Sequence, residues 1–111
     1  MVKSLVKKYT DSMETLMNCA ATCENCVSVS INDGKPLSCC SICMDCADMC
    51  MLTFRLEAHN STYLKATYRL CAEICEACAT ECEKHADYHP HCKACMYACR
   101  DCAEKCRSLI N

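Results

Sequence analysis

The sequence predicts an all-α protein, an antiparallel up-down four-helix bundle with a cysteine-lined core. Of its 111 residues, 17 are cysteine, and within four runs successive cysteines lie three or four residues apart, except for the adjacent Cys39 and Cys40. This is the spacing of inward-facing positions on a packed helix. The chain also contains one glycine and two prolines. So few breakers favour a few long helices with short connections over a sheet-rich or loop-rich fold.

Each expected helix carries one of the four cysteine runs. The cysteines are Cys19, Cys23 and Cys26; Cys39, Cys40, Cys43, Cys46 and Cys50; Cys71, Cys75, Cys78 and Cys82; and Cys92, Cys95, Cys99, Cys102 and Cys106. A seam that normally contains Leu, Ile or Val therefore contains thiols, and all seventeen are candidate metal ligands.

The first two helices are separated by a turn. We expect the first to run from Val2 or Ser4 to about Ser30, because residues 32–36 combine asparagine, aspartate, glycine and proline, the residue types that favour turns. The second helix is expected from about Leu37 to Ala58.

The third and fourth helices have their own boundary signals. Asn60 or Ser61 is suited to cap the start of the third helix, which we expect to end near Asp87. Pro90 is suited to the first position of the fourth helix, which we expect to end near Ile110. Because all three connections are short, neighbouring helices should run antiparallel, and residues 1–111 should form one bundle domain.

The inward-facing stripe extends beyond the cysteines, and its two ends differ. At one end it continues through mainly apolar residues, which should form a dry plug and keep the metal-free chain folded. They are Leu5, Tyr9, Ser12, Leu16, Phe54, Leu64, Tyr68 and Leu109. At the other end the stripe continues from Cys82 to His85 and His89, with His91 beside Cys92. We expect a mouth lined by cysteine and histidine at this end, and His59 on the surface near the plug.

Thiols at this spacing can hold soft metal ions. Residues four apart on a helix have Cβ atoms roughly 5–6 Å apart, and two sulfurs on either side of a linear ion stand about 4.6 Å apart if zinc–sulfur bond lengths are taken as a guide. Thiolates select Cu(I), zinc or iron–sulfur clusters. Low coordination number and charge favour multiple Cu(I) ions, because one monovalent ion per thiolate is neutral whereas zinc tetrathiolates bury negative charge.

Three other classes of protein are also rich in cysteine. A disulfide scaffold is disfavoured by the odd cysteine count, the helical spacing and the absence of a signal-peptide pattern. An iron–sulfur electron-transfer protein is favoured by one run alone, in which Cys40, Cys43, Cys46 and Cys50 match the ferredoxin spacing while Met51 occupies the usual proline position. A zinc–thiolate store is the third alternative.

Composition disfavours other function classes. The net charge of −2 comes from interleaved signs, so we expect no nucleic-acid partner. No apolar run reaches the length of a membrane span, and we expect no membrane interaction. Without a signal-peptide pattern, the chain should stay in the reducing cytoplasm, where thiols persist. We find no nucleophile–base pair and no thioredoxin-like redox motif, and therefore expect no enzyme activity.

The four striped helices, together with the Y-H-P-H-C-x-x-C pattern from Tyr88 to Cys95, resemble the cytosolic branch of the bacterial copper storage proteins. This resemblance implies a bundle that loads many Cu(I) ions along its core and assembles as a homotetramer. It implies that the seventeen cysteines are core ligands and that His85, His89 and His91 line the mouth. Either Cys39 or Cys40 can occupy the stripe. Val29 and Ser30, beyond Cys26, leave that wall of the mouth poorer in ligands. The sequence does not identify a copper chaperone or acceptor.

Overall fold

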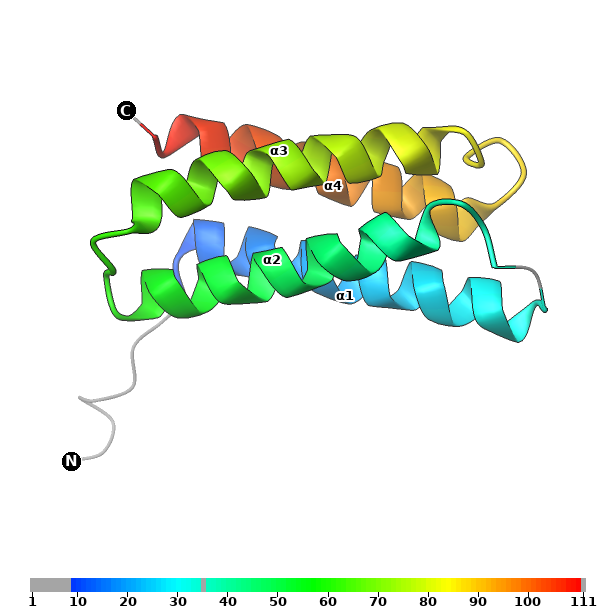
Figure 1. Cartoon of the computed structure of the whole chain (residues 1–111), viewed down its shortest axis with the longest axis horizontal. Coiled ribbons are helices and arrows are strands. Elements are labelled where there is room, and N and C mark those ends of the chain that lie inside the picture. Colours follow the sequence, from blue (N-terminus) through cyan, green and yellow to red (C-terminus); the bar gives the residue numbers. More distant parts are fainter. Residues whose placement is uncertain (1–8, 35, 111) are drawn as a thin grey trace.

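The computed structural model describes residues 9–34 and 36–110, which form four helices and contain no strand. These are α1 (Asp11–Asn32), α2 (Cys40–Ala58), α3 (Leu64–Glu83) and α4 (Pro90–Ser108). Consecutive helices run antiparallel (Figure 1). α1 packs against α2 and α4, and α3 packs against the same two helices, so the four helices surround a common interior. The predicted four-helix bundle is confirmed.

The boundaries of α1 and α2 differ from the sequence-based prediction. Val2 and Ser4 lie outside the described residues, but α1 begins at Asp11, where the Thr10 hydroxyl accepts a hydrogen bond from the Met13 N–H. A capping hydroxyl satisfies one of the free N–H groups at a helix start, so the predicted earlier start was wrong. α2 begins at Cys40 instead of Leu37, with Cys39 as its N-cap.

The boundaries of α3 and α4 follow from backbone constraints. Asn60 has a positive φ of 52°, a conformation that asparagine tolerates better than most residues, and it belongs to the turn. Neither Asn60 nor Ser61 caps α3 as predicted, because the N-cap is Tyr63. α3 begins at Leu64 and ends at Glu83, before the predicted Asp87. His89 is extended, because proline disfavours helical geometry in the residue that precedes it. Pro90 opens α4, as predicted.

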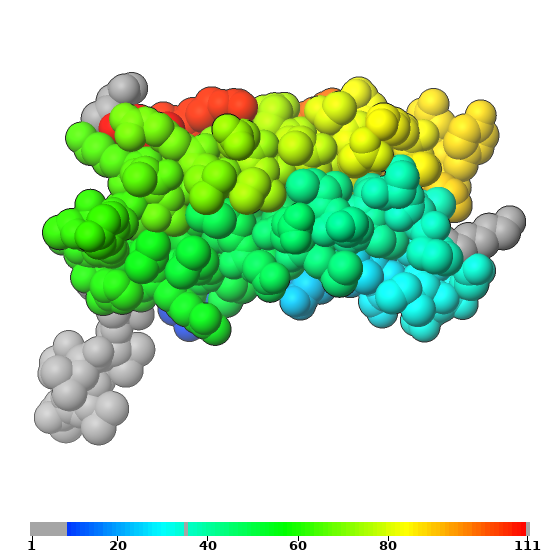
Figure 2. Space-filling model, in the orientation of Figure 1, coloured from blue at the N-terminus to red at the C-terminus, as the bar shows by residue number. Residues whose placement is uncertain are grey.

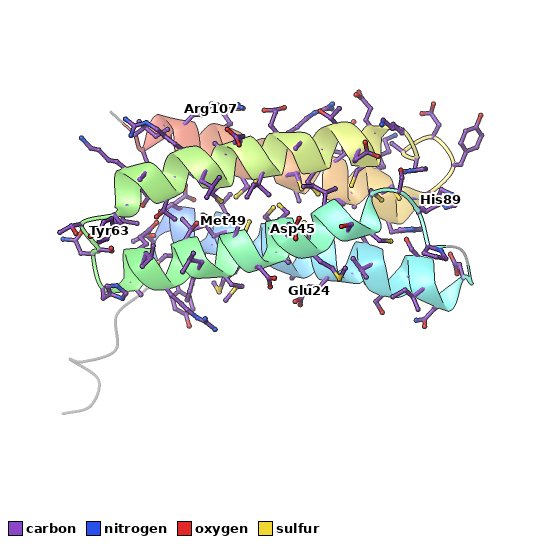
Figure 3. The ribbon with its side chains drawn as sticks, viewed as in Figure 1. Glu24, Asp45, Met49, Tyr63, His89 and Arg107 are labelled. Atoms are coloured by element: carbon purple, nitrogen blue, oxygen red, sulfur yellow. The ribbon has the colours of Figure 1, made fainter. Side chains whose placement is uncertain are left out.

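The interior consists mainly of cysteine and alanine. Every cysteine except Cys40 is buried, with at most 1% of its surface exposed. The buried polar residues are Ser12, Ser30, Thr53 and Thr67, so the described interior contains no fully buried carboxylate or basic side chain. Charged side chains such as Glu24 and Arg107 project outward (Figure 3). The side chains of α2 and α3 meet along one face of the bundle (Figure 2). None of the described helices is long and apolar enough to cross a membrane.

The end of the bundle that holds the α2–α3 connection, here called the closed end, only partly matches the predicted apolar plug. Leu16 and Tyr68 are buried, and Phe54, Leu64 and Leu109 pack partly buried against the core. Tyr9 is 56% exposed, and Leu5 lies outside the described residues. His59 is exposed, as expected.

A half-buried carboxylate makes the closed end polar instead of dry and apolar. Ser12 donates to Glu57 at 2.7 Å, and the Tyr68 hydroxyl donates to it at 2.8 Å. The Thr10 hydroxyl is a third contact of the same carboxylate. Burial and the hydrogen bond to Glu57 raise the pKa of Tyr68. These contacts join α1, α2 and α3, so a polar cluster closes this end of the bundle.

Replacing Glu57 with alanine should destabilise the metal-free bundle, because the hydroxyls of Ser12 and Tyr68 then lose their acceptor. We expect the free energy of unfolding in urea to fall by about 1–3 kcal/mol, the usual effect of leaving buried donors unsatisfied. Glu104→Ala on the exposed face of α4 is the matched control and should change stability little. Equal losses in the two variants would contradict a structural role for the Glu57 cluster.

Candidate metal centre

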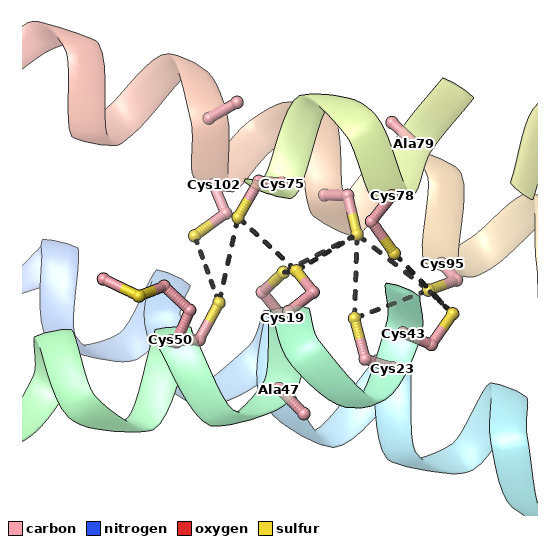
Figure 4. Close-up of a cluster of buried hydrophobic side chains, with 14 of the residues drawn as sticks. Cys19, Cys23, Cys43, Ala47, Cys50, Cys75, Cys78, Ala79, Cys95 and Cys102 are labelled. Atoms are coloured by element: carbon pink, nitrogen blue, oxygen red, sulfur yellow. Dashed lines mark hydrogen bonds between the residues drawn. The ribbon is translucent and has the colours of Figure 1, made fainter. Parts of the chain in front are cut away.

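The inward faces of the four helices place the cysteine sulfurs in layers along the bundle axis (Figure 4). Within each layer the ligand atoms all lie within 4.8 Å of one another. Four layers of four cysteines, in order from the closed end to the mouth, are Cys19, Cys50, Cys75 and Cys102; Cys19, Cys23, Cys46 and Cys99; Cys23, Cys43, Cys78 and Cys95; and Cys26, Cys39, Cys43 and Cys82. The first and third of these layers take one cysteine from each helix.

The shortest sulfur–sulfur distances join different helices. Cys46 lies 3.6 Å from Cys75, and Cys23 lies 3.6 Å from Cys95. Sulfurs four residues apart on one helix also approach each other, as Cys95 and Cys99 do at 3.9 Å. Two sulfurs of one helix can therefore bind an ion between them, as expected. Sulfurs on different helices, however, lie at least as close to each other.

Adjacent layers share members. Cys19, Cys23, Cys26 and Cys43 each belong to more than one group of close ligand atoms. A shared sulfur can bridge two ions, because a thiolate has more than one lone pair. The layers therefore form a continuous ladder of sulfur from the closed end to the mouth instead of a set of separate sites.

Burial and neighbouring sulfurs change the acidity of the thiols. Desolvation, with the nearby Cys82 and Cys92, raises the pKa of Cys39 to about 12, and desolvation also raises the pKa of Cys92. Deeper in the core, hydrogen bonds from neighbouring thiols, led by Cys23, lower the pKa of Cys95. Neighbouring S–H groups thus favour the thiolate at Cys95, whereas desolvation favours the protonated thiol at Cys39 and Cys92.

The adjacent cysteines at the start of α2, Cys39 and Cys40, differ in burial. Cys39 is fully buried in the layer nearest the mouth, with Cys26, Cys43 and Cys82. Cys40 is partly exposed and takes part in none of the four-cysteine layers above. Cys39 therefore occupies the stripe, and the assignment of Cys40 as a ligand stays a prediction.

The three predicted histidines lie together at the other end of the bundle, here called the mouth. A ring nitrogen of His91 lies within 4.8 Å of the sulfurs of Cys26 and Cys92. The rings of His89 and His91 have centroids 5.4 Å apart, and those of His85 and His89 are 6.4 Å apart. All three side chains are half-buried. The structure thus gathers His85, His89 and His91 in a short arc that begins at the outermost sulfurs.

Sequence reasoning missed the serines of the mouth. Ser30 contacts His91 and Ser38 contacts His85, each through its hydroxyl oxygen. From the sequence alone, Ser30 is a gap in the ligand wall. Its position one turn beyond Cys26 on the same stripe was a usable signal, because a hydroxyl at that position faces the same opening.

Comparison with known proteins identifies the family of this chain. The family model described as copper storage protein matches residues 5–111. The chain belongs to the copper storage protein family.

Solved structures of this family superimpose closely on the bundle. The Cu(I)-bound copper storage protein BsCsp3 is 36% identical, with a TM-score of 0.83, over 90% of this chain and 95% of that one. The apo form of copper storage protein 3 from Bacillus subtilis is 40% identical, with a TM-score of 0.82, over 90% and 96% of the two chains. A cytosolic copper storage protein from Streptomyces lividans with five coppers is 32% identical, with a TM-score of 0.79, over 89% and 88%.

The ferredoxin-like spacing on α2 is explained by the helix stripe. A cubane cluster needs four cysteines around one centre, but Cys43, Cys46 and Cys50 belong to successive layers along α2, and Cys40 lies outside them. The four cysteines of the motif do not converge on one point. The iron–sulfur alternative is therefore not favoured in this member of the family.

Removing deep sulfurs should lower metal capacity. In the double variant Cys46→Ala and Cys50→Ala we expect the number of Cu(I) ions held against a strong chelator to fall by a few, because each deleted sulfur contacts several others. Cys40→Ala is the matched control and should hold nearly the wild-type number. A loss of capacity from Cys40→Ala as large as that from the double variant would contradict the ladder as described.

Proposed function

We propose that this protein stores multiple Cu(I) ions on the thiolates that line its core and catalyses no reaction. The observation that carries this proposal is a ladder of buried thiols in a described interior without a buried charged side chain. Membership of the copper storage protein family and the likeness to Cu(I)-bound relatives support it. The proposed core ligands are the buried cysteines, with His85, His89 and His91 as ligands at the mouth.

Charge decides how much metal such a core can hold. Burying an uncompensated thiolate is strongly unfavourable, and no buried cation from the described chain offsets it. One Cu(I) ion per thiolate leaves the loaded core close to neutral. Filling toward that ratio therefore removes the electrostatic penalty, which favours high capacity over a few isolated sites.

A zinc store is the second candidate, and one distance favours it. Sulfurs around a tetrahedral zinc ion stand about 3.8 Å apart, which resembles the 3.6 Å to 3.9 Å spacing of neighbouring sulfurs here. However, successive layers share cysteines, so they cannot all form separate tetrathiolates. Zinc tetrathiolates would also leave about two negative charges at each site in a core without compensating cations. Both arguments favour Cu(I).

We propose that copper moves along the axis. An ion would bind first at the Cys/His mouth, where the histidine arc meets Cys26 and Cys92. Shared cysteines would then allow exchange from layer to layer without full release of the ion. The Glu57 cluster closes the opposite end, so loading and release would both occur at the mouth.

The setting of this function is also part of the proposal. A cytosolic relative from Streptomyces lividans supports a cytoplasmic location, where thiols stay reduced. By resemblance to the family we propose a homotetramer, with residues 1–111 of each chain forming one domain. Copper ions are the partner. We propose neither a nucleic-acid nor a membrane partner.

The capacity for Cu(I) tests the proposed function. We expect reduced, metal-free protein to retain on the order of one Cu(I) ion per cysteine in competition with a strong chelator, since that ratio neutralises the core. Zinc tested under the same competition is the control and should be retained poorly. Saturation at four or fewer copper ions, or a clear preference for zinc, would overturn the storage proposal.

The histidines should govern the rate of copper exchange more than the capacity. Replacing His85, His89 and His91 together with alanine removes ligands at the mouth but leaves the sulfur ladder intact. We expect a changed rate of copper extraction by a chelator and a nearly unchanged load. His59→Ala, at the exposed opposite end, should alter neither. A large loss of capacity with unchanged kinetics would refute this assignment of the mouth.

A further inference from the structure

Two serine hydroxyls contact the mouth histidines at the same ring position. The Ser30 Oγ on α1 lies 3.2 Å from Nε2 of His91, and Ser30 is 1% exposed. The Ser38 Oγ, just before α2, lies 2.8 Å from Nε2 of His85. Two serines from different elements of the fold thus engage the Nε2 atoms of two different histidines.

The hydrogen of Ser30 has a defined acceptor. A hydroxyl carries one hydrogen, and Ser30 donates it to the backbone carbonyl of Cys26 at 2.8 Å. A carbonyl oxygen can only accept, so Ser30 presents lone pairs to His91. The contact is attractive only if Nε2 of His91 carries the hydrogen and donates it to Ser30.

The hydrogen of Ser38 is directed in the same way. Ser38 donates to Oε2 of Glu81 at 2.9 Å, and the other oxygen of that carboxylate pairs with Lys84 at 2.6 Å. An ionised carboxylate can only accept. Ser38 therefore also presents lone pairs to its histidine, and Nε2 of His85 must be the donor.

We propose that Ser30 and Ser38 are positioning residues that hold His91 and His85 in the Nε2–H tautomer and leave Nδ1 of each as the atom that binds Cu(I). A neutral imidazole has one N–H and one free lone pair, so fixing the hydrogen fixes the ligand atom. The inference rests on the proposed function, since it names the copper-binding atoms at the mouth. The α1 wall beyond Cys26 then contributes orientation instead of a ligand.

The metal-free protein tests the serine contacts without reference to copper. In reduced protein with ¹⁵N-labelled histidine at about pH 8, above the usual histidine pKa, long-range ¹H–¹⁵N correlations report the tautomer of each ring. We expect His85 and His91 to be single Nε2–H tautomers and the exposed His59 to be a mixture. Ser30→Ala should convert His91 to a mixture, and Ser38→Ala should do so for His85.

Matched variants separate this effect from general disturbance. Ser28→Ala and Ser41→Ala change exposed serines close to Ser30 and Ser38 in sequence and should leave both tautomers unchanged. Ser38→Thr keeps the hydroxyl and should preserve the His85 tautomer. Unchanged circular dichroism would show that each alanine variant is folded. An Nδ1–H tautomer in the wild type, or no change at His91 in folded Ser30→Ala and at His85 in folded Ser38→Ala, would overturn the proposal.

Copper addition identifies the ligand atom. As Cu(I) is added to the labelled protein, the Nδ1 resonances of His85 and His91 should shift more than Nε2, whereas in each alanine variant both nitrogens of the affected histidine should shift. Larger shifts at Nε2 in the wild type would refute the assignment. The copper content of the same sample separates the two hypotheses: full loading without a shift at either histidine overturns the inference but leaves storage intact, and no loading overturns the storage proposal itself.

Discussion

The organisation of this bundle depends on one constraint: its interior contains many ionisable thiols and, in the described part of the chain, no buried charged side chain to balance them. While the thiols are protonated they behave as small apolar side chains, and helices can pack around them as around alanine. Once they ionise, the compensating charge has to come from bound cations. The same residues can therefore form the core of the empty protein and the ligands of the loaded one.

The two ends of the bundle respond to this constraint differently. At the closed end, Glu57 accepts hydrogen bonds from hydroxyls on neighbouring helices, so its charge is stabilised without entering the sulfur ladder. At the mouth, half-buried histidines lie next to the outermost cysteines. Neutral imidazoles are weaker soft ligands than thiolates, which suits exchange instead of retention. A storage core with one sealed end and one exchanging end follows from this distribution of side chains.

Cysteine periodicity was sufficient to predict the helices, the buried stripe and the gathering of His85, His89 and His91 at one end. It could not predict the layers, because spacing along one helix fixes which residues face inward but not how far one helix is shifted along another. The 3.6 Å approach of Cys46 to Cys75 depends on that shift. The position of Cys39 within the stripe likewise required the observed start of α2 at Cys40.

The missed polar contacts have a different origin. Glu57 reaches Ser12 across a sequence separation of 45 residues, and Ser30 reaches His91 across 61. The position of Ser30 one turn beyond Cys26 indicates that it faces the mouth, but the local sequence around Glu57 or Ser30 does not identify the partner of either residue. The prediction of Tyr9 in the core assumed that the helical stripe continues before Asp11, but α1 begins at Asp11. Long-range hydrogen bonds and helix ends are therefore the features that the sequence could not predict and that only the structure shows.

Proton release during copper loading tests the central claim most directly. If a core of mostly protonated thiols becomes a neutral core of Cu(I) thiolates, the total number of protons released at saturation should be close to the number of Cu(I) ions bound. A pH-stat titration of reduced, metal-free protein with Cu(I) measures both quantities in one experiment. One proton per ion at saturation is the expected result. Far fewer protons than copper ions would show that the thiols are not neutral before loading or are not the ligands, and would contradict the account.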